Sequence, residues 1–164
     1  MALVLNVLRV VAGLLGVAAL CAPAIPLLLF LLPSRRARVI VISAWAKSVG
    51  WLCVKLSGVS VEITGRERLA AARPAIFVIN HTSLLDVLLA MWLTPFGTTA
   101  VAKKEILWVP LVGLVYALSG SLRIDRRDRP RAVAAMAAQA RFLRDHGLSL
   151  AIWPEGTRSR TGRL

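Results

Sequence analysis

Apolar residues fill the first third of the chain with few interruptions. Residues 10–34 carry no charge, and at about 1.5 Å per residue a helix of this length covers the ~30 Å hydrocarbon core of a bilayer. Residues 39–58 form a second apolar stretch that two lysines interrupt. Pro33–Ser34 lies between the two stretches and favours a turn. The pattern therefore predicts a membrane-associated helical hairpin over residues 1–58, with its second helix lying in the membrane interface.

After residue 58 the pattern changes to short apolar runs separated by segments with helical periodicity. Five runs predict β-strands: residues 59–64, 75–79, 98–102, 121–124 and 148–152. Three segments between them predict helices: residues 84–93, residues 106–118 with a break or start at Pro110, and residues 130–146. Strands that alternate with helices of this length indicate βαβ units. The prediction is an α/β domain over residues 59–164, a mainly parallel sheet flanked by helices and preceded by the apolar hairpin.

Composition and charge restrict the classes of protein to consider. Hydrophobic residues make up 57% of the chain, and 21 Lys and Arg against 8 Asp and Glu give a net charge of +13. This much apolar area excludes an intrinsically disordered chain. The basic excess beside a long apolar segment favours an anionic membrane surface as a partner. A nucleic-acid-binding protein would also be basic but would not need the apolar start, so we expect no nucleic acid partner.

The distribution of charge also predicts the side of the membrane. Arg35, Arg36 and Arg38 follow the first apolar run, and only Arg9 precedes it. Because cytoplasmic flanks carry the excess of Lys and Arg, we expect the α/β domain on the cytoplasmic side of the cell inner membrane. A cleaved signal peptide is the alternative, although this run is longer than the usual apolar core of about 7–15 residues.

Residues 80–86 (NHTSLLD) follow a predicted strand and open a predicted helix. Ser83 fits the N-cap position, which puts Asp86 in the first turn and His81 in the loop before it. An imidazole oriented by a carboxylate can take a proton from a substrate hydroxyl, so His81 and Asp86 are candidate catalytic residues. The alternative is that Ser83 and Asp86 only form a capping box.

Two later loops carry basic residues. Five arginines lie between residues 123 and 131, where a solvated charged rim is the alternative to a binding site. Residues 153–160 (WPEGTRSR) follow the last predicted strand, and α/β sheets bind ligands at the C-terminal ends of parallel strands. A glycine, hydroxyls and an arginine in this loop suit a phosphate group, although an ordinary turn can have the same composition. Two cysteines and two histidines do not suit a structural zinc site, and we expect no metal or cofactor.

Taken together, these segments resemble the glycerolipid acyltransferase family, in particular the 1-acyl-sn-glycerol-3-phosphate acyltransferases. Residues 80–86 are similar to that family's Asn-His-x-Ser-x-x-Asp block, and residues 154–159 (PEGTRS) to its Pro-Glu-Gly-Thr-Arg-Ser block. Residues 103–105 fit as well, whereas Arg123 stands where the family usually has an aromatic residue. The family continues beyond the second block with another apolar strand. We therefore expect the α/β domain of this chain to be incomplete at its C-terminus.

The resemblance implies transfer of a fatty acyl group from acyl-CoA or acyl carrier protein to the sn-2 hydroxyl of 1-acyl-sn-glycerol-3-phosphate, giving phosphatidic acid. It implies that His81 is the general base on that hydroxyl and that Asp86 orients His81. It implies a glycerol-phosphate pocket formed by Arg126, Glu155, Gly156, Thr157 and Arg158. Lys103 or Lys104 would contact the phosphate or the developing oxyanion, or would only add surface charge near the membrane.

The hydroxyl would attack the thioester directly, with no acyl-enzyme, and the sequence contains no Gly-x-Ser-x-Gly nucleophile motif. Two alternatives stay open. One is an acyltransferase for another lysolipid acceptor, such as a lyso-ornithine lipid, and the other is a truncated, inactive membrane-binding paralogue.

Overall fold

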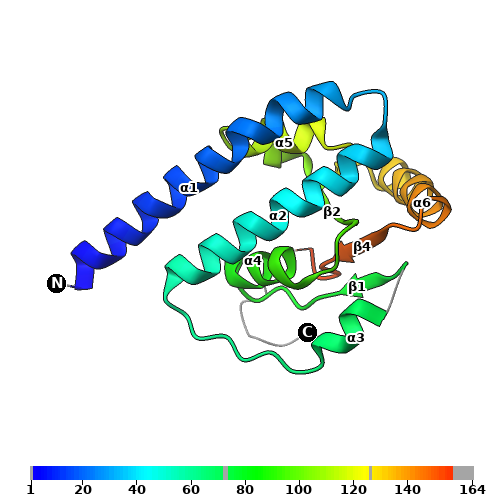
Figure 1. The fold of residues 1–164 in the computed structure, drawn as a ribbon. Helices are drawn as coiled ribbons and strands as arrows, with labels where there is room; N and C mark the ends of the chain where they lie inside the picture. The colour runs from blue at the N-terminus through cyan, green and yellow to red at the C-terminus, as the bar shows by residue number, and fades with distance from the viewer. Residues whose placement is uncertain (1, 72–73, 126, 157–164) are drawn as a thin grey trace.

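A parallel β-sheet forms the centre of the computed structural model, which describes residues 2–71, 74–125 and 127–156 (Figure 1). Its four strands are β1 (Ile76–Val78), β2 (Thr98–Lys103), β3 (Leu122–Ile124) and β4 (Ser149–Ile152), in the order β1-β4-β2-β3. All neighbouring strands are parallel, and β4 pairs with both β1 and β2. The C-terminal ends of β1 and β4 therefore lie side by side, and the loops that follow them meet at one edge of the sheet.

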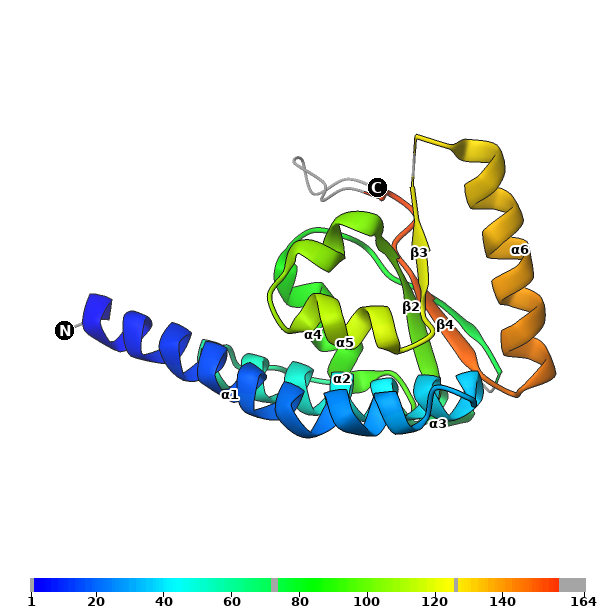
Figure 2. The same cartoon turned by 90° about the horizontal axis from the view of Figure 1, so that it is seen from above.

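Helices cover both faces of the sheet (Figure 2). α6 (Arg129–Asp145) lies on one face and contacts β3 and β4. α4 (Leu84–Leu93) and α5 (Val112–Leu118) lie on the other side, and the N-terminal helices run across the end of the sheet where β2 and β3 begin. The 3₁₀ helix η1 (Lys104–Trp108) leads from β2 toward α5, and α3 (Arg66–Ala71) precedes β1. This arrangement confirms the predicted α/β fold with a mainly parallel sheet flanked by helices.

Two long apolar helices, α1 (Ala2–Phe30) and α2 (Arg35–Ser57), form the predicted hairpin and run antiparallel (Figure 1). Ser34 caps the start of α2, because its Oγ accepts a hydrogen bond from the Ala37 N–H at 3.2 Å. Both helices are long and apolar enough to cross a membrane. The first turns of α1 extend beyond the rest of the molecule, and the N-terminal half of the helix exposes these apolar side chains: Leu3, Val4, Leu5, Val7, Leu8, Val10 and Val11. A surface of this kind suits lipid acyl chains better than water.

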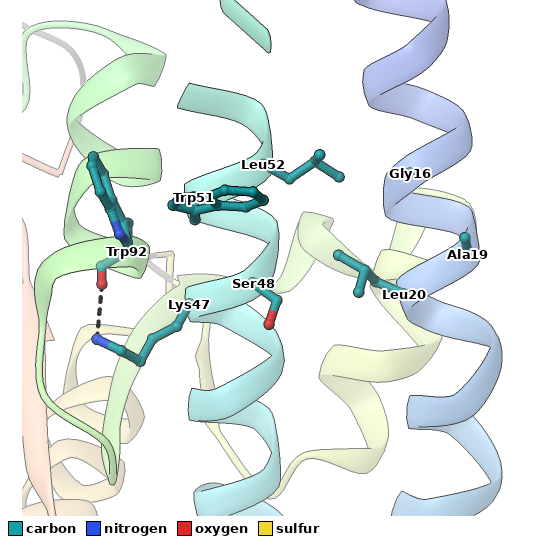
Figure 3. A pocket seen from close by; sticks show the side chains of 8 residues that line it. All are labelled: Gly16, Ala19, Leu20, Lys47, Ser48, Trp51, Leu52 and Trp92. Carbon is teal, nitrogen blue, oxygen red and sulfur yellow. Dashed lines mark hydrogen bonds between the residues drawn. The ribbon is translucent and has the colours of Figure 1, made fainter. Parts of the chain in front are cut away.

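Polar contacts fasten α2 to the α/β part of the molecule. At the start of α2, the Arg35 guanidinium donates to the Gly120 carbonyl at 3.0 Å and lies over the Phe142 ring of α6 at 4.0 Å. In the middle of α2, Lys47 Nζ donates to the Trp92 carbonyl at 2.8 Å, near the end of α4 (Figure 3). α2 therefore lies across the α/β part, not apart from it.

α2 and α4 also approach each other closely at Gly50. A Cβ atom at this position would lie 2.5 Å from the Leu88 carbonyl oxygen and 2.7 Å from the Trp92 backbone nitrogen. Because backbone atoms of α4 fill this space, only glycine lets the two helices pack at this distance.

A cavity of about 550 Å³ lies between α1, α2 and α4 (Figure 3). The residues that line it are Gly16, Ala19, Leu20, Lys47, Ser48, Trp51, Leu52 and Trp92. These walls are mostly apolar and include no histidine or carboxylate, so the candidate chemistry lies elsewhere.

The structure corrects some of the predicted elements. Residues 59–64 alternate apolar and polar side chains but pair with no strand among the described residues, so the strand predicted there is wrong. Val61 and Ile63 are half-buried, which explains the alternation, but a strand also needs a partner edge, and the described part of β1 pairs with β4. The helix expected over 106–118 is divided into η1 and α5, with Pro110 between them. α3 is too short to show a helical period, and the pattern does not predict it.

Candidate active site

His81 and Asp86 lie against each other at the N-terminus of α4. The loop after β1 carries His81, and Asp86 lies in the first turn of the helix. His81 Nδ1 is 3.0 Å from Asp86 Oδ1, and the two side chains are 20% and 15% exposed. In the neutral imidazole, a carboxylate at this distance favours the proton on Nδ1, so that the lone pair of Nε2 can accept a proton. The structure thus brings together the two side chains that the sequence proposes as a pair.

Asp86 also caps the helix. Its Oδ2 accepts hydrogen bonds from the backbone N–H groups of Thr82 and Ser83, each at 2.7 Å, and Ser83 completes the capping box. Partial burial of the carboxyl raises its pKa, but the hydrogen bonds from Ser83, Thr82 and His81 together outweigh burial and hold the pKa of Asp86 below its usual value. The capping box and the contact with His81 are therefore compatible, because each uses a different oxygen of one carboxylate.

The loop after β4 lies beside this pair. Because β1 and β4 are parallel neighbours, the Ile79 N–H just after β1 donates to the Ile152 carbonyl at 3.0 Å and holds the two loops together. Glu155 Oε1 accepts a hydrogen bond from the His81 backbone N–H at 3.1 Å. The Trp153 ring centroid lies 6.0 Å from that of His81. His81 is thus positioned both by Asp86 in the first turn of α4 and by the loop that follows β4.

A large cavity opens at His81, with a volume of about 1700 Å³. Drug-sized ligand pockets usually measure about 300–1,000 Å³, so this one has room for a longer molecule. Apolar side chains of α2 and α4 form part of its wall, among them Trp45, Val49, Leu88 and Met91. Its polar lining includes His81, Lys103, Arg129, Glu155 and Gly156. One cavity therefore combines an imidazole, two cationic side chains and an apolar wall.

The adjacent lysines at the end of β2 have different surroundings. Lys104 Nζ lies 2.6 Å from Asp125 Oδ2. This contact, together with a hydrogen bond from the Arg127 N–H, lowers the pKa of the Asp125 carboxyl. Lys103 instead lines the cavity. Lys104 is thus paired locally with Asp125, whereas Lys103 is exposed and lines the cavity.

Three residues predicted for the phosphate pocket lie outside the described residues: Arg126, Thr157 and Arg158. The structure places the other two, Glu155 and Gly156, at the cavity. Arg129 and Trp153 line the cavity too, although the motifs do not single them out as site residues. Arg129 begins α6, and only the tertiary structure shows that this end of the helix reaches the cavity.

The arrangement suits proton abstraction from an amphipathic ligand. A hydroxyl held against His81 Nε2 can lose its proton to the imidazole, and Asp86 stabilises the imidazolium that forms. Lys103 and Arg129 suit an anionic group, and the apolar wall suits a hydrocarbon chain. Within residues 2–71, 74–125 and 127–156, no three His, Cys, Asp or Glu side chains are grouped so that they could hold a metal ion.

The chain is similar to known acyltransferases in sequence. The sequence profile described as Acyltransferase matches residues 60–164. A 1-acyl-sn-glycerol-3-phosphate acyltransferase from Limnanthes douglasii is 38% identical over 138 residues, which cover 84% of this chain and 48% of the relative. The enzyme of the same name from Cocos nucifera is 41% identical over 138 residues, covering 84% of this chain and 44% of the relative. The chain therefore spans about half the length of these curated relatives.

The fold is similar to a solved structure. The crystal structure of the 1-acyl-sn-glycerophosphate (LPA) acyltransferase PlsC from Thermotoga maritima matches with a TM-score of 0.72 at 22% sequence identity. The match covers 100% of this chain and 66% of that chain. The profile match spans both the loop of His81 and Asp86 and the loop of Glu155. From this match, over more than half of its length, the chain belongs to the acyltransferase family.

Proposed function

We propose that this chain transfers a fatty acyl group from a thioester, acyl-CoA or acyl carrier protein, to the sn-2 hydroxyl of 1-acyl-sn-glycerol-3-phosphate. The product is phosphatidic acid. The observation that carries the proposal is the His81–Asp86 pair, 3.0 Å apart, at a cavity that also presents cations and an apolar wall. The names of the curated relatives support the same acceptor.

In the proposed mechanism, His81 Nε2 removes the proton of the acceptor hydroxyl while the hydroxyl oxygen attacks the thioester carbonyl carbon. Asp86 stabilises the resulting imidazolium through the Nδ1–H. The tetrahedral intermediate then collapses as its C–S bond breaks, and the imidazolium returns the proton to the leaving thiolate. The products are an ester and a free thiol, and the protein itself is never acylated.

Positive charge at the cavity supports the proposal that the acceptor carries a phosphate. Lys103 is the lysine that we assign to the phosphate or to the developing oxyanion, because Lys104 is paired with Asp125. Arg129 adds a second cation to the lining. We assign the glycerol-phosphate pocket to Glu155 and Gly156, completed by the residues outside the described ranges: Arg126, Thr157 and Arg158. Two cations at one cavity favour an acceptor with a phosphate over a zwitterionic lyso-ornithine lipid.

The apolar hairpin supports the proposal that the acceptor is a membrane lipid. α2 is fastened across the α/β part, and α1 runs beside it, so we propose that the hairpin lies in the bilayer surface instead of leading away from the cavity (Figure 2). Val17 of α1 and Ile42 of α2 line the same cavity as His81. Arg35 and Arg38 donate to the carbonyls of Gly120 and Leu118, whereas Arg36 is exposed. Arg36 suits an anionic leaflet, which we take to be the cytoplasmic side of the cell inner membrane.

Mass spectrometry of the lipid products tests this proposal. The protein is incubated in vesicles with each thioester donor and a panel of acceptors: 1-acyl-sn-glycerol-3-phosphate, glycerol phosphate, a lysophospholipid and a lyso-ornithine lipid. The expected product is phosphatidic acid from the first acceptor. Acylation of a different acceptor alone would replace the proposed substrate. Intact thioester with every acceptor, in a folded protein that binds the vesicles, would contradict the activity and favour a non-enzymatic membrane-binding protein.

A further inference from the structure

The segment between β2 and α5 exposes several large apolar side chains. Trp108 is 86% exposed, and its neighbours in this segment are between 44% and 49% exposed: Leu107, Val109, Leu111 and Leu114. We refer to residues 107–114 as the apolar loop. Large apolar side chains gathered on the surface in this way mark a site of interaction.

The backbone of the apolar loop fixes this exposure. Leu111 has φ 60° and ψ −51°, a conformation that residues other than glycine rarely adopt. The Val112 N–H donates to the Pro110 carbonyl at 2.6 Å, which makes this a γ-turn of the rare, strained form. Gly113 packs so tightly on η1 that a Cβ atom would lie 2.5 Å from the Leu107 carbonyl oxygen. The apolar side chains therefore project from a defined turn held by close packing.

The apolar loop is continuous with the surface of the hairpin. The inner face of α5 packs on α1, where Val115 is buried in a cluster with Cys21, Ala24 and Leu28. Figure 1 shows α5 beside the C-terminal half of α1, at the same edge of the molecule. On this half of α1, Leu27 and Phe30 are also exposed, by 44% and 81%. The apolar loop thus extends the exposed apolar surface that α1 begins.

The same segment also borders the cavity. Ile106, just before the apolar loop, and Val112, within it, line the cavity together with Lys103. The side chains between them, Trp108 above all, point to solvent. One short segment therefore has an inner side at the cavity that holds His81 and an outer side of exposed apolar groups.

We propose that the apolar loop inserts into the lipid bilayer as a second membrane contact beside the hairpin, so that the cavity opens directly onto the lipid. This inference rests on the proposed membrane association of the hairpin. A bilayer is the occupant, and not a second copy of the chain, because the loop continues the apolar surface of α1.

Quenching of tryptophan fluorescence by phospholipids with brominated acyl chains tests the insertion on the full chain. The vesicles contain phosphatidylcholine and phosphatidylglycerol. Trp108→Phe keeps an apolar ring and removes one of five tryptophans, so the difference between wild-type and variant emission reports on Trp108. The difference signal is expected to be blue-shifted and quenched. A red-shifted, unquenched difference signal, with the remaining emission quenched, would overturn the inference and leave the hairpin contact intact. Failure of the wild type to bind vesicles would overturn both.

A polar double variant, Leu107→Ser with Trp108→Ser, tests whether the apolar loop contributes to membrane binding and to turnover of a lipid acceptor. Its affinity for vesicles is expected to fall about tenfold or more, and its turnover of a lysolipid in vesicles to fall in parallel. Turnover of a short-chain, water-soluble acceptor is expected to stay unchanged. Ile76→Ser is the matched control, because Ile76 is 61% exposed but lies on β1, at the far edge of the sheet. Unchanged vesicle affinity, with a shift from dimer to monomer, would assign the loop to a second copy and overturn the inference.

Discussion

His81 Nδ1 lies 3.0 Å from Asp86 Oδ1, while the other oxygen of the same carboxylate accepts two backbone N–H groups at the start of α4. The helix cap therefore fixes the side chain of Asp86 in the orientation that His81 needs. Local secondary structure pre-organises the proposed base, and substrate binding does not have to arrange it.

Asp86→Asn and Ser83→Ala separate these two functions of the helix start. Asp86→Asn removes the charge that stabilises the His81 imidazolium, so we expect turnover to fall on the order of a hundredfold. Ser83→Ala removes the hydrogen bond from the Leu85 N–H and leaves His81 and Asp86 in place, so we expect a loss of about 1 kcal/mol of stability with turnover nearly unchanged. Steady-state kinetics and urea unfolding of both variants measure these effects. Equal loss of turnover in the two variants would show that Asp86 acts only by capping the helix.

Stability is expected to depend on pH through Asp86. Its pKa is lowered in the folded protein, so its contribution to the free energy of unfolding is present above the unfolded pKa of about 4 and is lost as the pH falls through the lower folded pKa. The wild type should exceed Asp86→Asn in stability by about 1 kcal/mol near neutral pH, and this difference should shrink in acid. Urea unfolding in detergent micelles across this pH range measures it. If the stability difference between wild type and Asp86→Asn grew in acid, the pKa of Asp86 would not be lowered in the folded protein.

The two adjacent lysines are expected to differ in their effects on activity. Lys103→Met removes a cation that lines the cavity, so kcat/KM for a phosphate-bearing acceptor should fall by about tenfold to a hundredfold. Lys104→Met breaks the exposed ion pair with Asp125, and such pairs contribute little, so we expect less than about a threefold change. Kinetics of the two variants with one acceptor make the comparison. A larger loss in Lys104→Met would reverse the assignment.

Gly50→Ala is expected to destabilise the packing of α2 on α4. The added methyl group would meet backbone atoms of Leu88 and Trp92 at 2.5 and 2.7 Å, which requires the helices to separate and costs about 1–3 kcal/mol. Gly13→Ala is the matched control, because the nearest atom to its methyl group is a Leu56 side-chain carbon at 3.9 Å. This control should gain about 0.5–1 kcal/mol from helix propensity. Thermal unfolding of both variants gives the two values, and similar stabilities would show that α2 and α4 separate without cost.

Local patterns were sufficient to predict much of the fold. The length of the apolar runs predicts the hairpin, and Leu84–Leu93 forms a helix over the predicted range because Ser83 caps it and Pro95 follows. Alternation of side chains in residues 59–64 was misleading, since it reports partial burial and says nothing about a partner strand.

In the site, too, contacts within one segment of the chain were predictable from the sequence, whereas contacts between distant segments were not. The pairing of His81 with Asp86 was predictable because both residues belong to one loop and one helix turn. Lys103 and Lys104 are adjacent in sequence, and their difference depends on Asp125, which follows a later strand. Arg129 reaches the cavity only through the placement of α6 on the sheet. Contacts between distant segments required the structure.

The rate of phosphatidic acid formation by His81→Ala, compared with that by His146→Ala, decides whether His81 is the general base. These are the two histidines of the chain, and His146 is exposed at the C-terminal cap of α6, with its Nδ1 2.8 Å from the Phe142 carbonyl oxygen. We predict that His81→Ala loses about 10²–10⁴-fold in rate while still binding vesicles, and that His146→Ala keeps the wild-type rate. Wild-type turnover in His81→Ala would show that His81 is not the base.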